Sequence, residues 1–196
     1  MVLFIAEHHG YIYKNLPLEY KKTLNKKAQD EIIRHIKGIY KDIVLKFEPD
    51  LILHELVMPN KFYTYEEFKK SVENKERINY YYNSRTNKEA VFLDYEGILR
   101  CKCAVAGLED LAILEHKSSD EEYVNKLREK TMLANIEKYI KQGYEKIVVN
   151  VGMDHIQYKT VLNDYLNKNS DVFVVMPDGK KYDKHKPGNY FKRIFK

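Results

Sequence analysis

The chain alternates short runs of apolar residues with longer segments in which apolar residues recur every three or four positions. The short runs predict buried strands, and these cover residues 2–6, 51–56, 146–151 and 172–176. The longer segments predict amphipathic helices over residues 28–47, 63–77, 120–143 and 156–166. Two further strands are predicted at 90–93 and 99–105, around a turn near Gly97.

A strand followed by a long helix and another strand is typical of a right-handed crossover between parallel strands. The repeated alternation therefore predicts an α/β protein, a three-layer sandwich with a mixed, partly parallel central sheet. Residues 1–179 are expected to form this domain, and residues 180–196 a basic and aromatic C-terminal segment. In such sheets ligands bind beyond the carboxyl ends of the strands, which directs attention to the polar residues there.

The formal net charge of +5 comes entirely from the C-terminal residues. Residues 178–196 hold seven Lys or Arg and two acidic residues, and the other 27 basic residues are balanced by 27 acidic ones. The body of the domain therefore lacks the basic excess of a nucleic-acid-binding protein. Contact of the tail with nucleic acid or an anionic membrane is an alternative, but Tyr190, Phe191, Ile194 and Phe195 have the spacing of one helix face that packs on the domain.

The two cysteines, Cys101 and Cys103, lie one residue apart in a predicted strand, where their side chains would point to opposite faces. We expect two reduced thiols and a reducing, cytoplasmic location. The first residues are predicted to form a strand and not an export signal. No apolar run is long enough to span a bilayer.

Three of the predicted strands are followed by ionisable residues. Glu7 and His9 follow the first strand, Glu55 lies at the end of the second, and His155 follows the strand over residues 146–151. If these strands are parallel, two imidazoles and two or three carboxylates converge at one edge of the sheet. This set is suited to Zn²⁺, Mn²⁺ or a similar ion, and equally to general acid–base chemistry without a metal.

Each of these residues also has a purely structural interpretation. Glu55 would be solvated if the chain reaches the surface at Leu56. Asp154 would cap the helix that follows, and His155 would lie at that helix N-terminus. There the helix dipole favours a neutral imidazole, which is the form that binds metals.

The order of these motifs resembles one superfamily, across residues 2–176. It contains the TraB/PrgY pheromone-shutdown proteins, the Tiki Wnt-cleaving proteases, the erythromycin esterases and the ChaN-like haem-binding proteins. The matching positions are Ala6, Glu7 and His9; Glu55; Arg128, Glu129 and Met132; and Gly152 and His155. The segment from Ala104 to Asp110 is similar to the strand in which the family places a glycine followed by an acidic residue. Ala6 and Glu129 depart from the family's usual Gly and Asp or Asn.

The resemblance implies a hydrolase of a peptide, ester or amide bond, acting on a small molecule or peptide. His9 would be the general base or a metal ligand, and His155 the acid or second ligand. Glu7 and Glu55 would bind Mn²⁺, Co²⁺ or Zn²⁺ or orient the imidazoles, and Arg128 would neutralise the carboxylates or stabilise an oxyanion. The alternative is a non-catalytic protein that sequesters a peptide, haem or metal through the same residues. Both interpretations predict that Glu7, His9, Glu55 and His155 converge within several Å of a common point.

Overall fold

The computed structural model describes residues 1–7, 26–80, 88–116, 118–156, 160–168 and 172–175. Six strands of these residues form one sheet in the order β3-β4-β2-β5-β1-β6. They are β1 (Val2–Glu7), β2 (Leu51–His54), β3 (Phe62–Tyr63), β4 (Ala104–Gly107), β5 (Ile147–Gly152) and β6 (Val172–Val175). Neighbouring strands are parallel except β3, which pairs antiparallel with β4. The predicted mixed, partly parallel sheet is confirmed.

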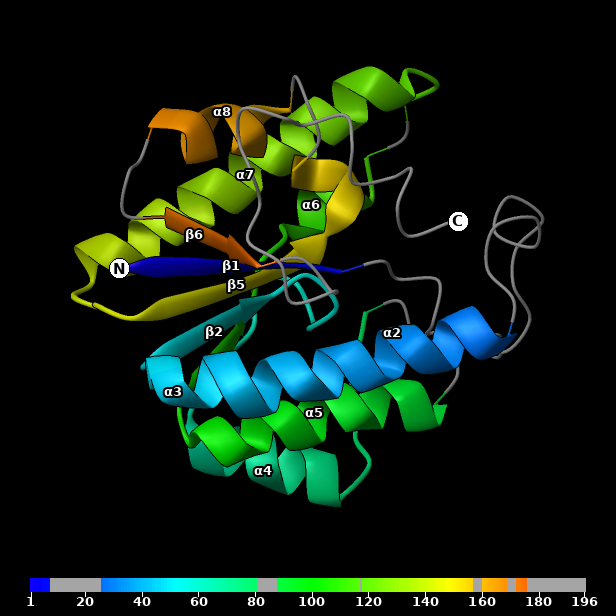
Figure 1. The fold of residues 1–196 in the computed structure, drawn as a ribbon. Coiled ribbons are helices and arrows are strands. Elements are labelled where there is room, and N and C mark those ends of the chain that lie inside the picture. The colour runs from blue at the N-terminus through cyan, green and yellow to red at the C-terminus, as the bar shows by residue number, and fades with distance from the viewer. Residues whose placement is uncertain (8–25, 81–87, 117, 157–159, 169–171, 176–196) are drawn as a thin grey trace.

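Helices cover both faces of the sheet, which completes the predicted three layers (Figure 1). One layer holds α2 (Lys26–Ile39), α3 (Leu45–Phe47), α4 (Tyr65–Glu73) and α5 (Lys88–Cys101). The other holds α6 (Leu111–Leu114), α7 (Glu121–Lys141) and α8 (Val161–Lys168). The crossovers from β1 to β2 and from β2 to β4 use the first layer, and those from β4 to β5 and from β5 to β6 use the second.

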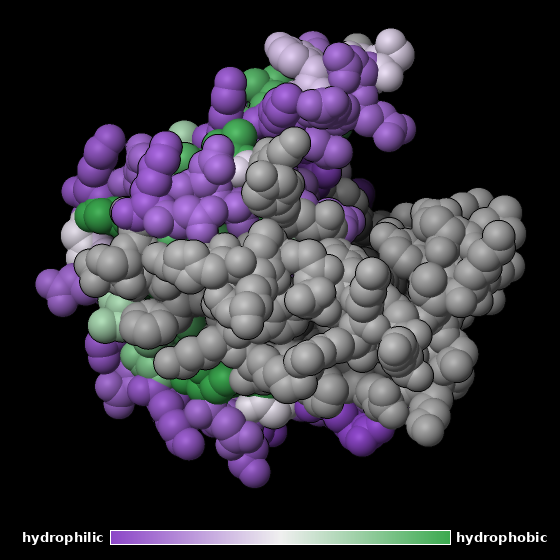
Figure 2. Space-filling model, turned by 45° about the horizontal axis from the view of Figure 1, so that its top comes forward, coloured by the Kyte–Doolittle hydropathy of each residue, from purple (hydrophilic) through white to green (hydrophobic). Residues whose placement is uncertain are grey.

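Alternate residues of each strand pack in two separate apolar cores, because successive strand side chains point to opposite faces. Leu3 and Ile5 belong to the core under the α2 layer, whereas Phe4 and Ala6 belong to the core under the α7 layer. On the face shown in Figure 2 the described surface is predominantly hydrophilic, with smaller hydrophobic areas between the charged side chains. None of the described helices is both long and apolar enough to span a membrane.

The prediction of strands at 90–93 and 99–105 is wrong for most of this segment. Residues 88–101 form α5, and only β4 remains as a strand. Gly97 is not a turn residue but a packing residue within α5. A Cβ at this position would lie 2.8 Å from Cγ of Tyr40, so the absence of a side chain allows α5 to pack against the Tyr40 ring.

The two cysteines are free, but their predicted placement on opposite faces of a strand is wrong. Cys101 is the last residue of α5 and Cys103 precedes β4, and both pack on the core under the α2 layer. Burial raises the pKa of the Cys101 thiol to about 11 and that of Cys103 to about 12. Both thiols are therefore protonated and unreactive near neutral pH.

The other helices appear where the periodicity predicts them, with shifted ends. The segment predicted as a helix over 28–47 is helical throughout and contains a π-helical turn, Tyr40–Val44. Asp120 is the N-cap of α7 and accepts a hydrogen bond from the Tyr123 amide at 3.0 Å. The segment predicted as a helix over 156–166 is divided into a 3-10 turn, Met153–Ile156, and α8. The C-terminal segment 180–196, its packing and the domain boundary before it lie outside the described residues.

Candidate functional site

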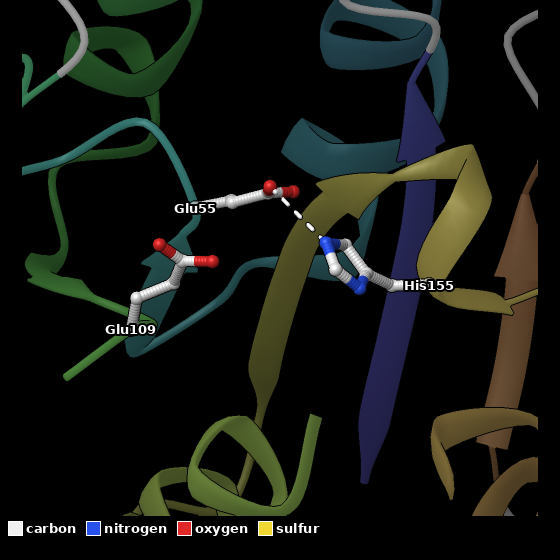
Figure 3. Close-up of side chains that lie close together, drawn as sticks. All are labelled: Glu55, Glu109 and His155. Carbon is white, nitrogen blue, oxygen red and sulfur yellow. Dashed lines mark ion pairs between the residues drawn. The ribbon is translucent and has the colours of Figure 1, made fainter. Parts of the chain in front are cut away.

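Three buried ionisable side chains meet at the carboxyl edge of the sheet, beyond the ends of three neighbouring strands (Figure 3). Glu55 directly follows β2, Glu109 follows β4 by two residues, and His155 lies in the 3-10 turn after β5. Their exposed fractions are 4%, 1% and 6%. The chain leaves β2 toward the α2 layer but leaves β4 and β5 toward the α7 layer, so adjacent strands diverge at this edge. Such divergence is typical of ligand sites in open α/β sheets.

Glu55 is at the centre of this cluster because the side chains of β2 alternate between the two faces of the sheet, and this alternation continues to Glu55. Leu51 and Leu53 face the α7 layer, and Glu55 takes the next position on the same face. Its amide donates to the Asn150 carbonyl at 3.0 Å, which extends the pairing of β2 with β5 by one residue. One carboxylate oxygen, Oε2, accepts a hydrogen bond from the Gly152 amide. The other, Oε1, is left to contact side chains.

Arg128 of α7 joins Glu55 to Glu109. Its Nε donates to Oε1 of Glu109 at 2.8 Å, and its Nη2 contacts the same oxygen. Nη2 also donates to Oε1 of Glu55 at 3.2 Å. The Arg128 side chain is 19% exposed, whereas the Glu55 and Glu109 side chains are 6% and 1% exposed. A buried carboxylate requires such a charged partner, and the guanidinium is the part of the cluster that reaches toward solvent.

His155 lies between two carboxylates. Its Nε2 is 3.4 Å from Oε1 of Glu55, and its Nδ1 is 3.4 Å from Oε1 of Glu129. Glu129, the neighbour of Arg128 on α7, is itself buried, and its Oε2 accepts a hydrogen bond of 2.6 Å from the Val161 amide at the start of α8. The imidazole is thereby held between α7 and β2.

The surroundings of His155 favour its charged form. Burial alone would lower its pKa, but hydrogen bonds to Glu129 and Glu55 and the charge of Glu55 raise the pKa to about 9. The imidazole is therefore protonated at neutral pH, which corrects the expectation of a neutral ring at a helix N-terminus. An imidazolium donates from both nitrogens and has no lone pair for a metal.

The structure brings together three of the predicted site residues, Glu55, Arg128 and His155. It adds Glu109 and Glu129, which the sequence places in recognisable motifs without marking them as site residues. The signal for Glu109 was an acidic residue just beyond a strand, as for Glu55. The signal for Glu129 was an acidic residue beside Arg128 on a helix that packs on the sheet.

Glu7 does not converge with this cluster, so that expectation is wrong. It is fully buried, and its Oε1 accepts a hydrogen bond from Nδ2 of Asn150, which also donates to the Tyr40 hydroxyl at 3.2 Å. Ile5, two residues earlier in β1, and Tyr40 belong to the core under the α2 layer. Glu7 thus points to the opposite face of the sheet from Glu55. His9 lies outside the described residues.

The donor set provides a partial fit to a divalent metal ion. One ligand atom each from Glu55, Glu109 and His155 lies within 4.8 Å of the others. However, Arg128 donates to both carboxylates and so supplies the positive charge that a metal would bring. In this arrangement the side chains form an ion-pair cluster, and a metal ion would have to displace the Arg128 guanidinium and the imidazole proton.

Compared with known proteins, the chain matches no family model, no curated protein and no solved structure at a significant level.

Proposed function

We propose that this protein is a hydrolase of a peptide, ester or amide bond that uses acid–base catalysis at the cluster of Glu55, Glu109, Arg128, Glu129 and His155. The observation that carries the proposal is the shared carboxylate of Glu55. One of its oxygens contacts both the Arg128 guanidinium at 3.2 Å and the His155 imidazole at 3.4 Å. A proton donor and a fixed positive charge are thus held side by side at a sheet edge where ligands bind.

In this proposal each side chain has a distinct role. Protonated His155 donates a proton to the leaving group, because its raised pKa keeps a proton available at neutral pH. Arg128, the most exposed member, stabilises the negative charge that develops on the carbonyl oxygen. Glu55, Glu109 and Glu129 hold these two cations in place as positioning residues.

The general base is assigned to His9, on the superfamily resemblance alone. It would take a proton from water as the water oxygen bonds to the carbonyl carbon. The bond to the leaving group then breaks, and that group receives the proton of His155. Atoms and charges balance without a cofactor. The resemblance to the erythromycin esterase branch supports this metal-free form.

Turnover of a panel of p-nitrophenyl esters and fluorogenic peptides tests the proposal. The variants His155→Gln and Arg128→Lys should each lower kcat/KM by about 10²–10⁴-fold, the usual contribution of a proton donor or an oxyanion contact. His116→Gln is the matched control, because His116 is an exposed histidine that is not a member of the cluster. Full activity of a folded His155→Gln protein would contradict the acid–base mechanism, and full activity of His9→Ala would remove the base assignment.

A metal-dependent hydrolase is the second candidate, favoured by the proximity of Glu55, Glu109 and His155. Turnover in the presence of a chelator, compared with added Mn²⁺, Co²⁺ or Zn²⁺, separates the two candidates. The ion-pair arrangement predicts activity that chelation leaves unchanged. Activity that requires added metal would support a rearranged cluster in which a cation displaces Arg128.

The alternative class is a protein that sequesters a peptide, haem or metal without turning it over. Stoichiometric binding with no product from any panel member would favour this class over a hydrolase. A haem titration followed by visible spectroscopy tests one version, since a ligated haem shifts its Soret band. The two free thiols, Cys101 and Cys103, support the further proposal of a reducing, cytoplasmic location.

A further inference from the structure

A hollow lies in the layer of helices on the opposite side of the sheet from the charged cluster. It has a volume of about 220 Å³ and opens between α5 and the helical segment formed by α2 and the π-helical turn. Lys37 and Lys41 line one side, and Arg100 and Glu96 line the other. These two helical segments run side by side in Figure 1. The described lining residues of the hollow thus belong to two helical segments.

Among the described residues that line this hollow, positive charge exceeds negative charge. Lys37, Lys41 and Arg100 accompany one acidic residue, Glu96, and none of the three cations forms an ion pair with another described residue. Exposed lysines elsewhere do form such pairs, as Lys146 does with Glu48 at 3.4 Å. Lys37 and Lys41 are also four residues apart on one helix, a spacing at which like charges are destabilising. An anion bound between them would offset that repulsion.

Two glycines shape the hollow, and they do so differently. Gly97 is required by packing, because a Cβ there would lie 2.8 Å from the Tyr40 ring. Gly38 has no such requirement, since a Cβ at this position would meet nothing within 4 Å. A glycine within a helix costs about 1 kcal/mol relative to alanine. At Gly38 the absence of a side chain leaves the hollow open, although no packing contact in the core requires a glycine there.

The helix itself is irregular at this point. The π-helical turn Tyr40–Val44 begins two residues after Gly38, and Tyr40 lines the hollow. Isolated π-helical turns within longer helices occur frequently at functional sites. Here the turn places Tyr40 in the core while Lys41 stays exposed at the hollow.

We propose that this hollow binds the phosphate group of a small phosphorylated molecule. Arginine offers a planar fork to phosphate oxygens, and lysine offers a point charge, so Arg100, Lys37 and Lys41 together provide a complementary set. The hollow is larger than a phosphate ion requires, which leaves room for atoms esterified to the phosphate. The proposal is independent of the hydrolase proposal, because no residue is shared between the two sites.

Calorimetric titration of the full chain at constant ionic strength tests this site, with inorganic phosphate and glycerol 3-phosphate as probes. Both probes should bind, and glycerol 3-phosphate should bind more tightly. The double variant Lys41→Gln, Arg100→Gln should weaken binding at least tenfold. The matched control Lys46→Gln, Lys141→Gln removes the same charge from exposed lysines outside the hollow and should leave binding unchanged.

A steric variant distinguishes a built pocket from a diffuse positive surface. Gly38→Leu fills the hollow and keeps every charge, so it should also weaken binding at least tenfold, whereas Gly38→Ala should bind as the natural protein does. Circular dichroism of both variants reports whether they are folded, and Gly38→Ala is expected to raise the melting temperature. Absence of binding to the natural protein, or undiminished binding to folded Gly38→Leu, would overturn the proposal.

Discussion

The carboxyl edge of the sheet has buried polar side chains on both faces, and the contacts that these side chains make differ between the faces. On the face toward α7, the carboxylates of Glu55, Glu109 and Glu129 are paired with the cations of Arg128 and His155. On the face toward α2, the carboxylate of Glu7 accepts a hydrogen bond from the Asn150 amide.

Successive side chains of a strand point to opposite faces of the sheet, so the position of a residue in its strand decides which other charged residues it can contact. Glu7 and Glu55 both lie at strand ends on the same edge, yet their side chains continue opposite faces of the sheet. The face toward α7 has an imidazole with a raised pKa, His155, and a partly exposed cation, Arg128. The described part of the other face has fully buried polar groups, which suits a structural role.

The largest expected difference between the faces comes from removing Arg128. Arg128→Met leaves Glu55 and Glu109 buried without their guanidinium, and breaking a buried ion pair in this way costs about 3–5 kcal/mol of unfolding free energy. Urea unfolding followed by circular dichroism measures the loss. Lys126→Met is the control, because Lys126 pairs with Glu122 on the exposed surface of the same helix and its loss should not be measurable.

A second variant separates charge burial from lost packing. The Arg128→Met variant leaves two carboxylates without the guanidinium. The double variant Glu109→Gln, Arg128→Met removes one of these two carboxylates and should recover part of the stability lost in Arg128→Met. If the double variant is as unstable as the single one, the loss reflects packing of the arginine stem, and the description of this face as an ion-pair cluster is wrong.

The next effect is a dependence of stability on pH that His155, on the α7 face, should produce. The pKa of His155 is raised to about 9 in the folded protein, above its ordinary value near 6.5 in the unfolded chain. Its contribution is complete below about pH 6.5 and is lost as the pH rises through 9. The loss amounts to at most about 3.5 kcal/mol over this interval, at about 1.4 kcal/mol for each unit of pKa shift.

Unfolding free energies measured from pH 6 to 8.5 check this expectation. The cysteine thiols begin to ionise in the unfolded chain in the upper part of this interval, but they do so equally in the natural protein and in His155→Gln. The natural protein should lose stability steadily with rising pH, and His155→Gln should show a much flatter profile. Parallel profiles for the two proteins would mean that His155 does not hold its proton, and the acid role proposed for it would fall with that result.

The layers of the fold could be predicted from the sequence because its strands and helices have clear apolar patterns. The failure at residues 88–101 has a physical cause. A glycine between two apolar runs is typical of a turn, but Gly97 lacks a side chain because the ring of Tyr40, far away in the sequence, packs against it. Local sequence patterns contain no information about such a contact, so they predict two strands where the structure has a helix.

The site residues that directly follow a strand could be predicted from the sequence, because an apolar run marks each strand. Glu55 and His155 follow apolar runs, and Arg128 came from the family resemblance. The side to which Glu7 points depends on the register of β1 against β5, where Ile5 pairs with Asn150 and Glu7 with Gly152. Register is a tertiary property, so the sequence alone gave no means of separating Glu7 from Glu55. His9 stays a prediction.

A smaller effect is expected on the α2 face from Tyr40→Phe. This variant removes the hydroxyl that accepts a hydrogen bond from Asn150 and leaves the ring packed on Gly97. The expected loss is about 1 kcal/mol, the usual net worth of one neutral hydrogen bond, and it should not change between pH 6 and 8.5. Urea unfolding at both ends of that range measures it. A pH-dependent loss would indicate that the Tyr40 face also contains a group that titrates in this interval.

The smallest effect is the coupling between the two faces, and it tests whether they are separate at all. The two cores are formed by alternate strand residues: Tyr40 contacts Asn150 on one face, and His155 contacts Glu55 and Glu129 on the other. A double-mutant cycle of Tyr40→Phe with His155→Gln should therefore give an interaction energy below about 0.5 kcal/mol. The cycle of Glu109→Gln with Arg128→Met, within one cluster, should give about 0.5–3 kcal/mol.

Strand β5 is the element that could couple the two faces, because it contacts residues on both. The Asn150 amide group contacts Tyr40, while the backbone of Gly152 donates to Glu55. A coupling across the sheet as large as that within the cluster would show that β5 transmits strain between the faces, and the Glu7 face would then take part in setting the geometry of Glu55.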